Sequence, residues 1–292
     1  MNPAWSVVVP TYNRPRQLAR CLAALADLHP PGGGFEVIVI NDSGIDVRHI
    51  VAASSVTNIR FLSQANAGPG AARNHGARAA LGSWLAFTDD DCEPDRDWLR
   101  AFERSLLPSP GALVGGTVVN SLVDNVYAET SQQLAGFVER WFDGTAKERF
   151  FTSNNLAAAR TAYLEVGGFD ESFGISAGED REFCDRWFAQ GRLSITAPDA
   201  RVRHSHMLTL RSFLRQHFAY GCGAAAFRRV RRSAGRAVRI DPEFYIASLR
   251  HAAGVKPATR GIALAAFTLA AHAAYATGLA RESLKRRGFT EK

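Results

Sequence analysis

The sequence has few of the residues that mark specialised protein classes. Its four cysteines lie far apart and form no CxxC pair, which argues against a disulfide framework or a zinc ribbon and favours a reducing compartment. The N-terminal segment MNPAWSVVVPTYNRP lacks a basic region followed by a long apolar stretch, so no signal peptide is expected. With 46% hydrophobic and 22% charged residues over 292 positions, the composition excludes a disordered chain, a fibrous protein and a polytopic membrane protein.

Acidic residues are absent from one long segment. Residues 201–240 hold ten arginines and no Asp or Glu. Residues 1–150 carry 13 Lys+Arg and 16 Asp+Glu, a balance of −3, whereas residues 151–292 carry 22 and 12, a balance of +10. Such a basic segment suits nucleic acid, an anionic membrane or a phosphorylated ligand, although a solvated basic face has the same composition.

The first half alternates short apolar runs with helical patterns. Strands are expected over 6–9, 35–40, 59–62 and 84–88, and helices over about 15–28, 46–52 and 70–81. We expect Asn13 to cap the first helix, with Pro15 in its first turn. Repeated alternation of strand and helix predicts βαβ units around a parallel sheet, which is an α/β fold.

The second half is less regular. Strands are expected over 112–119 and 150–152, and helices over 179–190 and 212–230. No internal repeat or linker is visible, so we predict one compact domain over 1–230 and a helical C-terminal extension over 231–292. Residues 261–280 carry no formal charge, but they are rich in alanine and include His272. An Ala-rich helix packed on the domain, or lying at a membrane interface, is therefore favoured over a membrane span.

Polar clusters follow three of the predicted strands. In α/β sheets, ligands bind beyond the carboxyl ends of the strands. Three adjacent carboxylates repel one another unless a cation compensates, and carboxylate oxygens are ligands that Mg²⁺ or Mn²⁺ prefers. For the aspartate cluster at 89–91, the alternative interpretation is a solvated acidic turn. The clusters are Thr11-Tyr12-Asn13, Asn41-Asp42-Ser43 and Asp89-Asp90-Asp91.

Three further segments carry candidate chemistry. In NAGPGAARNHG (66–76), two glycines allow close backbone approach and the following helix offers free N–H groups to an anion, but the segment is neither a P-loop nor a GxGxxG fingerprint. In GGFDESFGISAGEDREF (167–183), Glu179 and Asp180 stand at a helix start, where simple capping is the alternative role. In RVRHSHM (201–207), His204 and His206 alternate as on a strand, and either could ligate a metal.

In their joint order, these segments resemble the family 2 glycosyltransferases over about residues 5–230. The segments are SVVVPTYNRP, VIVINDSG, GPGAARNHGARAALGSWLAFTDDD, NNLAAARTAYLEVGGFDESFG and GEDREFCDRW, followed by a later histidine. The resemblance implies a GT-A fold with a Rossmann-like, mainly parallel sheet flanked by helices. It also implies inverting, hexosyltransferase-type transfer from a nucleotide sugar. Asn41 departs from the aspartate of many members, and the QxxRW motif of processive synthases is absent, so transfer of one sugar is expected.

The resemblance further implies roles for individual residues. Residues 1–120 would bind the donor, a sugar on UDP, GDP or dTDP, and residues 121–230 the acceptor. Asp91 and His204 would hold Mn²⁺ or Mg²⁺, and Asp180, paired with Glu179, would take the proton of the acceptor hydroxyl. The nucleotide-sugar site would consist of Pro10, Thr11, Asn13, Asp42, Arg73, Asp89 and Asp90.

Partners and rival functions follow from the same residues. We expect a sugar, lipid-linked or small-molecule acceptor, no nucleic acid, and a cytoplasmic location with peripheral contact at the inner membrane face. A nucleotidyltransferase would usually carry a Gly-rich loop after the first strand, where this chain has PTYNRP. A non-catalytic nucleic-acid-binding protein that uses 201–240 leaves the acidic clusters unexplained. A glycoside hydrolase needs two carboxylates about a glycosidic bond, which the spacing alone leaves open.

Overall fold

The computed structural model describes residues 2–143, 149–173, 177–236 and 241–285. Within these ranges, eight strands form one mixed sheet in the order β3-β2-β1-β4-β7-β6-β8-β5. Strands β1 to β4 pair in parallel, as do β6 and β8, whereas β7 runs antiparallel to β4 and β6, and β5 antiparallel to β8. The strands are β1 Trp5–Thr11, β2 Phe35–Asn41, β3 Ile59–Ser63, β4 Trp84–Thr88, β5 Cys92–Pro94, β6 Leu113–Asn120, β7 Asn155–Ala159 and β8 Ser194–His204.

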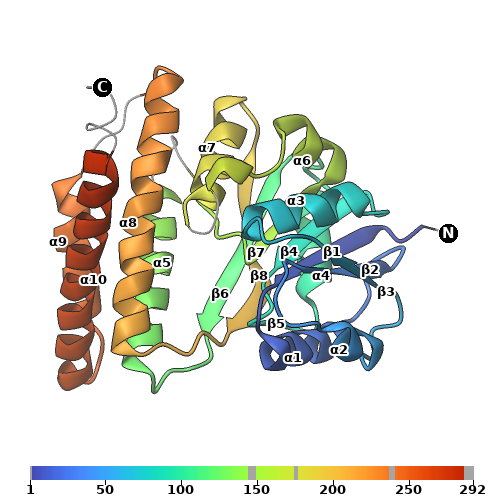
Figure 1. Ribbon diagram of the computed structural model, residues 1–292, viewed down its shortest axis with the longest axis horizontal. Helices are drawn as coiled ribbons and strands as arrows, with labels where there is room; N and C mark the ends of the chain where they lie inside the picture. Colours follow the sequence, from blue (N-terminus) through green and yellow to red (C-terminus); the bar gives the residue numbers. More distant parts are fainter. Residues whose placement is uncertain (1, 144–148, 174–176, 237–240, 286–292) are drawn as a thin grey trace.

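Helices cover both faces of the sheet and form a separate group at one side of it. Figure 1 shows α1 and α2 on one face, α3, α6 and α7 on the other, and α5, α8, α9 and α10 standing together beside the sheet. The helices are α1 Pro15–Ala26, α2 Arg48–Ala52, α3 Pro69–Ala79, α4 Trp98–Leu106, α5 Val126–Asp143, α6 Arg160–Val166, α7 Glu179–Ala189, α8 Leu210–Ser233, α9 Pro242–Ala253 and α10 Ala258–Lys285, with a 3-10 turn at Glu171–Phe173.

The core has one cluster on each face of the sheet. In β1, Val7 and Val9 pack with α1 and α4, while Val8 between them packs with α3. Every residue of β1 is buried, as expected for a strand covered by helices on both faces. The four strands and three helices expected in the first half are therefore confirmed, and the fold is α/β as predicted.

Asn13 does not cap α1, contrary to the expectation. The residue adopts a left-handed backbone with φ of 57°, and its Oδ1 accepts a hydrogen bond of 2.8 Å from the N–H of Ile45. Arg14 is the N-cap of α1, without a side-chain capping bond. The side chain of Asn13 therefore ties the loop after β1 to the loop after β2.

The strand expected over 150–152 is wrong. Strand β7 begins at Asn155, and Phe151 is buried before it. A Cβ atom on Gly115 of β6 would lie 2.0 Å from the Phe151 ring, so this ring fills the space that the glycine leaves. Thr152 donates its Oγ1–H to Glu139 Oε1 of α5 at 3.1 Å. Apolar burial, rather than strand pairing, explains the Phe150-Phe151 pattern.

The C-terminal helices pack through backbone contact. A Cβ atom on Gly221 of α8 would lie 2.0 Å from the carbonyl of Tyr275, and one on Gly278 of α10 would lie 2.0 Å from the carbonyl of Phe218. Within the described part of the chain, one helix is long and apolar enough to span a membrane: α10, in which an 18-residue window of Ala258–Leu284 has a mean hydropathy of 1.5 and is 22% buried. The four cysteines are free.

Candidate active site

The carboxyl ends of β1, β2 and β4 open into one large cavity. Its volume is about 1670 Å³, and its walls include these strand ends, the start of α7, the end of β8, and α5, α8, α9 and α10. The cavity thus lies between the sheet and the C-terminal helices. It gathers the predicted site residues Pro10, Thr11, Asp42, Arg73, Asp89, Asp90, Asp91, Glu179, Asp180 and His204.

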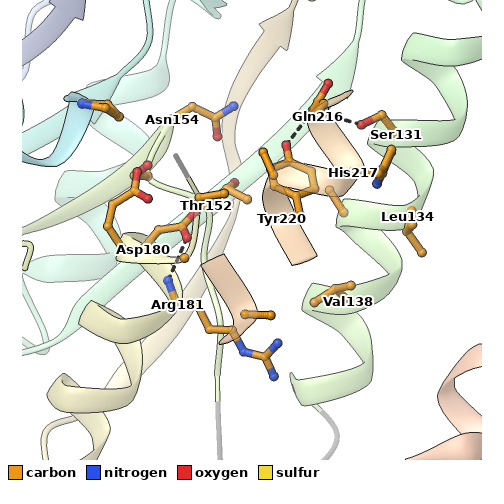
Figure 2. A pocket seen from close by; sticks show the side chains of 18 of the residues that line it. Ser131, Leu134, Val138, Thr152, Asn154, Asp180, Arg181, Gln216, His217 and Tyr220 are labelled. Atoms are coloured by element: carbon orange, nitrogen blue, oxygen red, sulfur yellow. Dashed lines mark hydrogen bonds between the residues drawn. The ribbon is translucent and has the colours of Figure 1, made fainter. Parts of the chain in front are cut away.

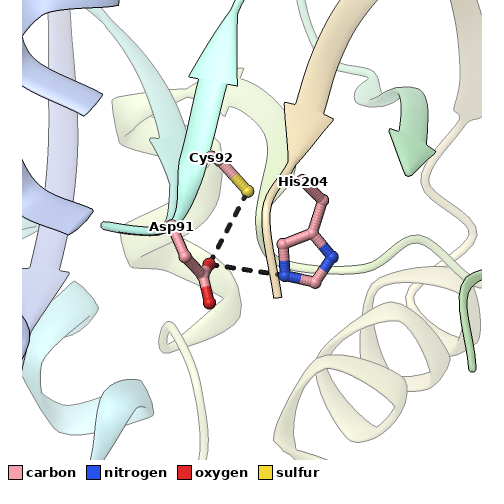
Figure 3. A group of neighbouring side chains, drawn as sticks. All are labelled: Asp91, Cys92 and His204. Atoms are coloured by element: carbon pink, nitrogen blue, oxygen red, sulfur yellow. Dashed lines mark hydrogen bonds and ion pairs between the residues drawn. The ribbon is translucent and has the colours of Figure 1, made fainter. Parts of the chain in front are cut away.

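Asp91 and His204 face each other at this cavity. Figure 3 shows Asp91, at the end of the β4–β5 turn, opposite His204 at the end of β8, with the Cys92 sulfur directed at the Asp91 carboxylate. Asp91 Oδ1 lies 3.4 Å from His204 Nε2 and 4.0 Å from Cys92 Sγ. Burial alone would lower the pKa of His204, but the hydrogen bond and charge of Asp91 raise it. The same contact and Arg14 outweigh burial and lower the pKa of Asp91.

Asp90 points away from His204 and toward the first strand. Its Oδ2 accepts a hydrogen bond of 2.7 Å from Thr11 Oγ1, and its Oδ1 lies 3.2 Å from Arg14 Nη1. The same Arg14 nitrogen lies 2.8 Å from Asp91 Oδ2. Burial raises the pKa of Asp90 to about 7, against the opposing charge of Arg14. Arg14 therefore bridges two of the three adjacent carboxylates and offsets their repulsion.

Asp89 is paired with Arg73 of α3. Arg73 Nη2 lies 2.5 Å from Asp89 Oδ1, and its Nη1 lies 3.5 Å from Glu179 Oε1. Arg73 is only 3% exposed, so its guanidinium is held between these two carboxylates. The next residue, Asn74, bonds to both the N–H and the carbonyl of Phe169. The side chain of Asn74 thereby links α3 to Phe169, just after α6.

Asp42 organises the glycine-containing turn before α3. Its Oδ1 accepts from the N–H of Ala67 and from Gln64 Nε2, each at 2.9 Å. Its Oδ2 accepts from the N–H of Gly68 at 2.9 Å. Gly68 has φ of 94°, which favours glycine. The carboxylate of Asp42 thus shapes the turn at the cavity edge.

Asp180 stands at the start of α7 and lines the cavity. Its Oδ1 accepts a hydrogen bond of 2.8 Å from the N–H of Arg181, and Figure 2 shows it beside Thr152 and Asn154. Burial, and then the charge of neighbouring Glu179, raises the pKa of Asp180 to about 7. A carboxylate with such a pKa can accept a proton near neutral pH. Glu179 turns instead toward Arg73.

Helix α5 supports the histidine. Gln132 Oε1 lies 3.2 Å from His204 Nδ1, and Gln132 Nε2 donates to the carbonyl of Val118 at 3.4 Å. A proton held on Nδ1 by this contact leaves Nε2 directed at Asp91. The ring of His206 lies 5.4 Å from that of His204, and burial lowers the pKa of His206 to about 4.

The donor set fits a divalent cation. Two ligand atoms, each about 2.1 Å from one octahedral ion and at right angles, lie roughly 3.0 Å apart. The 3.4 Å between Asp91 Oδ1 and His204 Nε2 is close to that separation. Burial raises the pKa of the Cys92 thiol well above its ordinary value, so the protonated thiol is a poor ligand. The Asp91 carboxylate suits Mn²⁺ or Mg²⁺, whereas the soft metals that select thiolates would find no thiolate at Cys92.

Sequence patterns missed two residues at the site. Arg14 bridges Asp90 and Asp91, and its position just after β1 is the signal that could have indicated it. Gln132 lies in α5, which no pattern predicted. Asn13, in contrast, is absent from the described lining of the cavity, because its side chain bonds to Ile45.

Residues 6–167 match the family described as Glycosyl transferase family 2. The chain belongs to this family. Relatives include chondroitin synthase of Escherichia coli, 31% identical over 64% of this chain and 32% of that protein, and pre-mycofactocin glycosyltransferase of Mycobacterium tuberculosis, 29% identical over 75% of this chain and 46% of that protein. The chain thus spans about a third to a half of the length of these curated relatives.

Two solved structures share the fold. The mannosyltransferase PcManGT from Pyrobaculum calidifontis, in complex with GDP-Man and Mn²⁺, superposes with a TM-score of 0.66 at 18% identity, covering 98% of this chain and 88% of that one. Residues 1–349 of S. aureus TarS, in complex with UDP, give a TM-score of 0.53 at 20% identity, covering 99% and 92%. These likenesses confirm the predicted GT-A-like architecture of this family 2 member.

Proposed function

We propose that this family 2 member transfers one sugar from a nucleoside-diphosphate sugar to an acceptor hydroxyl, with inversion and with the help of a divalent cation. The observation that carries the proposal is the arrangement around one cavity of the Asp91–His204 pair and of Asp180, whose pKa is raised to about 7. Family membership and the nucleotide-bound structures of PcManGT and TarS support a nucleotide-sugar donor.

The donor occupies the strand-end side of the cavity in this proposal. Pro10, Thr11 and Asp42 border the nucleotide, and the buried Arg73 keeps Asp89 in a fixed position. Asp91 and His204 hold the cation, and the Mn²⁺ of the PcManGT structure supports that assignment. A bound divalent cation supplies charge neutralisation for the departing diphosphate. Arg14 compensates the remaining charge of the aspartate cluster.

Asp180 is the base in this proposal. An inverting transfer needs one group that takes the proton of the attacking hydroxyl. Asp180 borders the cavity, and burial together with Glu179 gives its carboxylate the basicity for this step near neutral pH. Glu179 is held by Arg73 and acts on Asp180 through its charge. These are the roles that the family resemblance implies for the two residues.

Nucleic-acid binding is not proposed, because several arginines of 201–240 serve the fold. Arg203 pairs with Asp95, and Arg229 with Glu282. Arg231 and Arg236 both pair with Asp185.

Calorimetric titration with UDP, GDP and dTDP, each with and without Mn²⁺, tests the proposal. We expect one nucleotide to bind at least tenfold more tightly with Mn²⁺, and Asp91→Asn to remove this dependence while the fold is retained. The matched control is Asp95→Asn. Asp95 follows β5 directly and is partly exposed, so this variant should keep the Mn²⁺ dependence of nucleotide binding. Metal-independent binding, or no binding of any of the three nucleotides, would contradict the proposal.

We also propose peripheral attachment of this chain to the inner membrane face. Helix α10 exposes an apolar stripe that includes Ile262, Leu269 and Leu284, and basic residues near an anionic leaflet each contribute about 1 kcal/mol. We expect the protein to sediment with vesicles that contain phosphatidylglycerol more than with neutral vesicles, and high salt to release it. Equal sedimentation with both vesicle types would rule out electrostatic attachment.

A further inference from the structure

The cavity is larger than one substrate requires. Its volume of about 1670 Å³ exceeds the roughly 300–1,000 Å³ of an ordinary small-molecule site. Beyond Asp180, it continues between α5, α8, α9 and α10, whose residues form much of its lining. Figure 2 shows Asp180 and Arg181 on one side of this continuation and Leu134 and Val138 of α5 on the other, with Tyr220 of α8 between them. We call this continuation the helical chamber.

The walls of the helical chamber are apolar and aromatic. Leu134, Val138 and Trp141 follow i, i+4, i+7 spacing on α5, so they share one face of that helix. Tyr245 of α9 and Tyr275 of α10 stand among the residues that line the same cavity. Three walls of the chamber therefore present carbon surface at the place where an acceptor must approach Asp180.

The helical chamber also contains positively charged side chains. Arg228 of α8 lines the cavity, and among the residues that the structure describes, its guanidinium has no hydrogen-bonding or ion-pair partner. Arg181 lines the same space and stacks over the Phe227 ring at 5.0 Å. Burial raises the pKa of the Tyr275 hydroxyl, and the charges of Arg181 and Arg228 oppose this rise. A guanidinium enclosed beside aromatic rings favours an anionic ligand.

We infer that the acceptor is an amphipathic anion, with an apolar body between α5, α9 and α10 and a phosphate-like group at Arg228, so that its hydroxyl end reaches Asp180. This inference rests on the proposed function and adds the class of acceptor to it. Two sources share this chemistry: a flexible lipid phosphate and a soluble aromatic phosphate. The long chamber and the exposed apolar stripe of α10 suit the lipid, and the experiment separates the two.

Binding of model compounds tests the inference with the donor site already filled. The protein is saturated with Mn²⁺ and whichever nucleotide it binds, then titrated calorimetrically with decyl phosphate below its micellar concentration, 1-naphthyl phosphate, inorganic phosphate and uncharged decyl maltoside. We expect decyl phosphate to bind at least tenfold more tightly than inorganic phosphate or decyl maltoside. Tighter binding of 1-naphthyl phosphate than of decyl phosphate would support the amphipathic anion and identify it as aromatic.

Three variants locate the binding. Arg228→Gln should weaken decyl phosphate about tenfold or more, the usual effect of losing a charge-assisted hydrogen bond, and should leave decyl maltoside unchanged. Val138→Asp should weaken both alkyl compounds. The control is Arg232→Gln. Arg232 is exposed on α8 and does not line the cavity, so this variant should change the binding of neither alkyl compound.

Two outcomes would overturn the inference, and both differ from a failure of the proposed function. The first is that neither decyl phosphate nor 1-naphthyl phosphate binds more tightly than inorganic phosphate. The second is binding that Arg228→Gln and Val138→Asp leave intact. In either case, nucleotide binding measured on the same sample reports separately on the donor site.

Discussion

Asp180 combines a cavity position with a pKa raised to about 7 by burial and by Glu179. If Asp180 is the base, its ionised form is active, so log kcat should rise with pH up to about 7 and then level off. Asp180→Asn should reduce kcat by about 10²–10⁴, the usual contribution of a positioned base, and leave nucleotide affinity intact. Steady-state kinetics over pH 5.5–9 and calorimetry measure both quantities.

Glu179→Gln is the control for the preceding variant. It removes a charge that acts on Asp180 but keeps an oxygen that can accept from Arg73. We expect the rising limb of its pH profile to move to lower pH, because the pKa of Asp180 would fall. A loss of activity in Glu179→Gln with near-normal turnover in Asp180→Asn would show that the wrong carboxylate had been chosen.

We expect Gln132 to act through His204 rather than on substrate. Its Oε1 lies 3.2 Å from His204 Nδ1, and loss of such a supporting contact usually weakens metal binding 10–100-fold. Gln132→Leu should therefore raise the Mn²⁺ concentration for half-maximal activity by that factor, while kcat recovers at saturating Mn²⁺. Gln133→Leu, its neighbour on α5, should leave the Mn²⁺ requirement unchanged. A kcat loss that Mn²⁺ does not restore would contradict a positioning role.

At the residue scale, the sequence motifs indicated most residues of the candidate site but not the residues that support them. The aspartates after β4 and the Glu-Asp pair that begins α7 lie in segments whose order resembles a known family. Arg14 and Gln132 were missed because their roles arise from contacts between distant segments: 76 and 77 positions separate Arg14 from its two aspartates, and 72 separate Gln132 from His204. Periodicity carries no information about such pairs.

The α8–α10 pair depends on glycines at its crossing. A Cβ atom on Gly278 would lie 2.0 Å from the backbone carbonyl of Phe218, so Gly278→Ala must push the helices apart. We expect a loss of about 1–3 kcal/mol in the free energy of unfolding, as for other overpacked sites. Gly136→Ala on α5 is the matched control, since its Cβ would meet only the flexible end of Arg140. Urea denaturation of both variants measures the difference, and equal stability would contradict the tight crossing.

The helices and strands of the first half could be predicted because each has a simple hydrophobic pattern: helical spacing in the helices and continuous apolar runs in the strands. Strands β1 and β2 are buried along almost their whole length and read as apolar runs. The second half breaks these rules. Strand β8 contains Pro198, and its register with β6 shifts between Gly115 and Thr117, so its alternation is interrupted. Phe151 is apolar because it fills the space beside Gly115, not because it belongs to a strand.

For the whole molecule, a buried carboxylate makes stability depend on pH. Burial raises the pKa of Glu139 from 4.5 to about 7, although Thr152 donates two hydrogen bonds to it. Between these values the unfolded chain loses this proton and the folded protein retains it. The free energy of unfolding should therefore decrease as pH rises from about 4.5 to 7.

Glu139→Gln tests this dependence. The amide has no proton to lose, so the variant should be more stable than the wild type at pH 8, by about 1–3 kcal/mol, and nearly equal at pH 4.5. Denaturation by urea at the two pH values measures this. Asp124→Asn, at an exposed position, is the control and should change the free energy of unfolding equally at the two pH values. A Glu139→Gln effect that is the same at both pH values would contradict a raised pKa of Glu139.

Arg14 has a practical consequence for how this enzyme is handled. Because its guanidinium already lies 3.2 Å from Asp90 and 2.8 Å from Asp91, the acidic cluster keeps a resident counter-charge in the presence of a chelator. Treatment with EDTA should therefore lower the melting temperature by no more than a few degrees, as differential scanning fluorimetry would record. In Arg14→Gln, the cluster should instead become dependent on added Mn²⁺ for its stability. We therefore expect that the wild-type protein can be stripped, stored and reloaded with a cation of choice, so that the cation of the proposed site would serve as an exchangeable reagent.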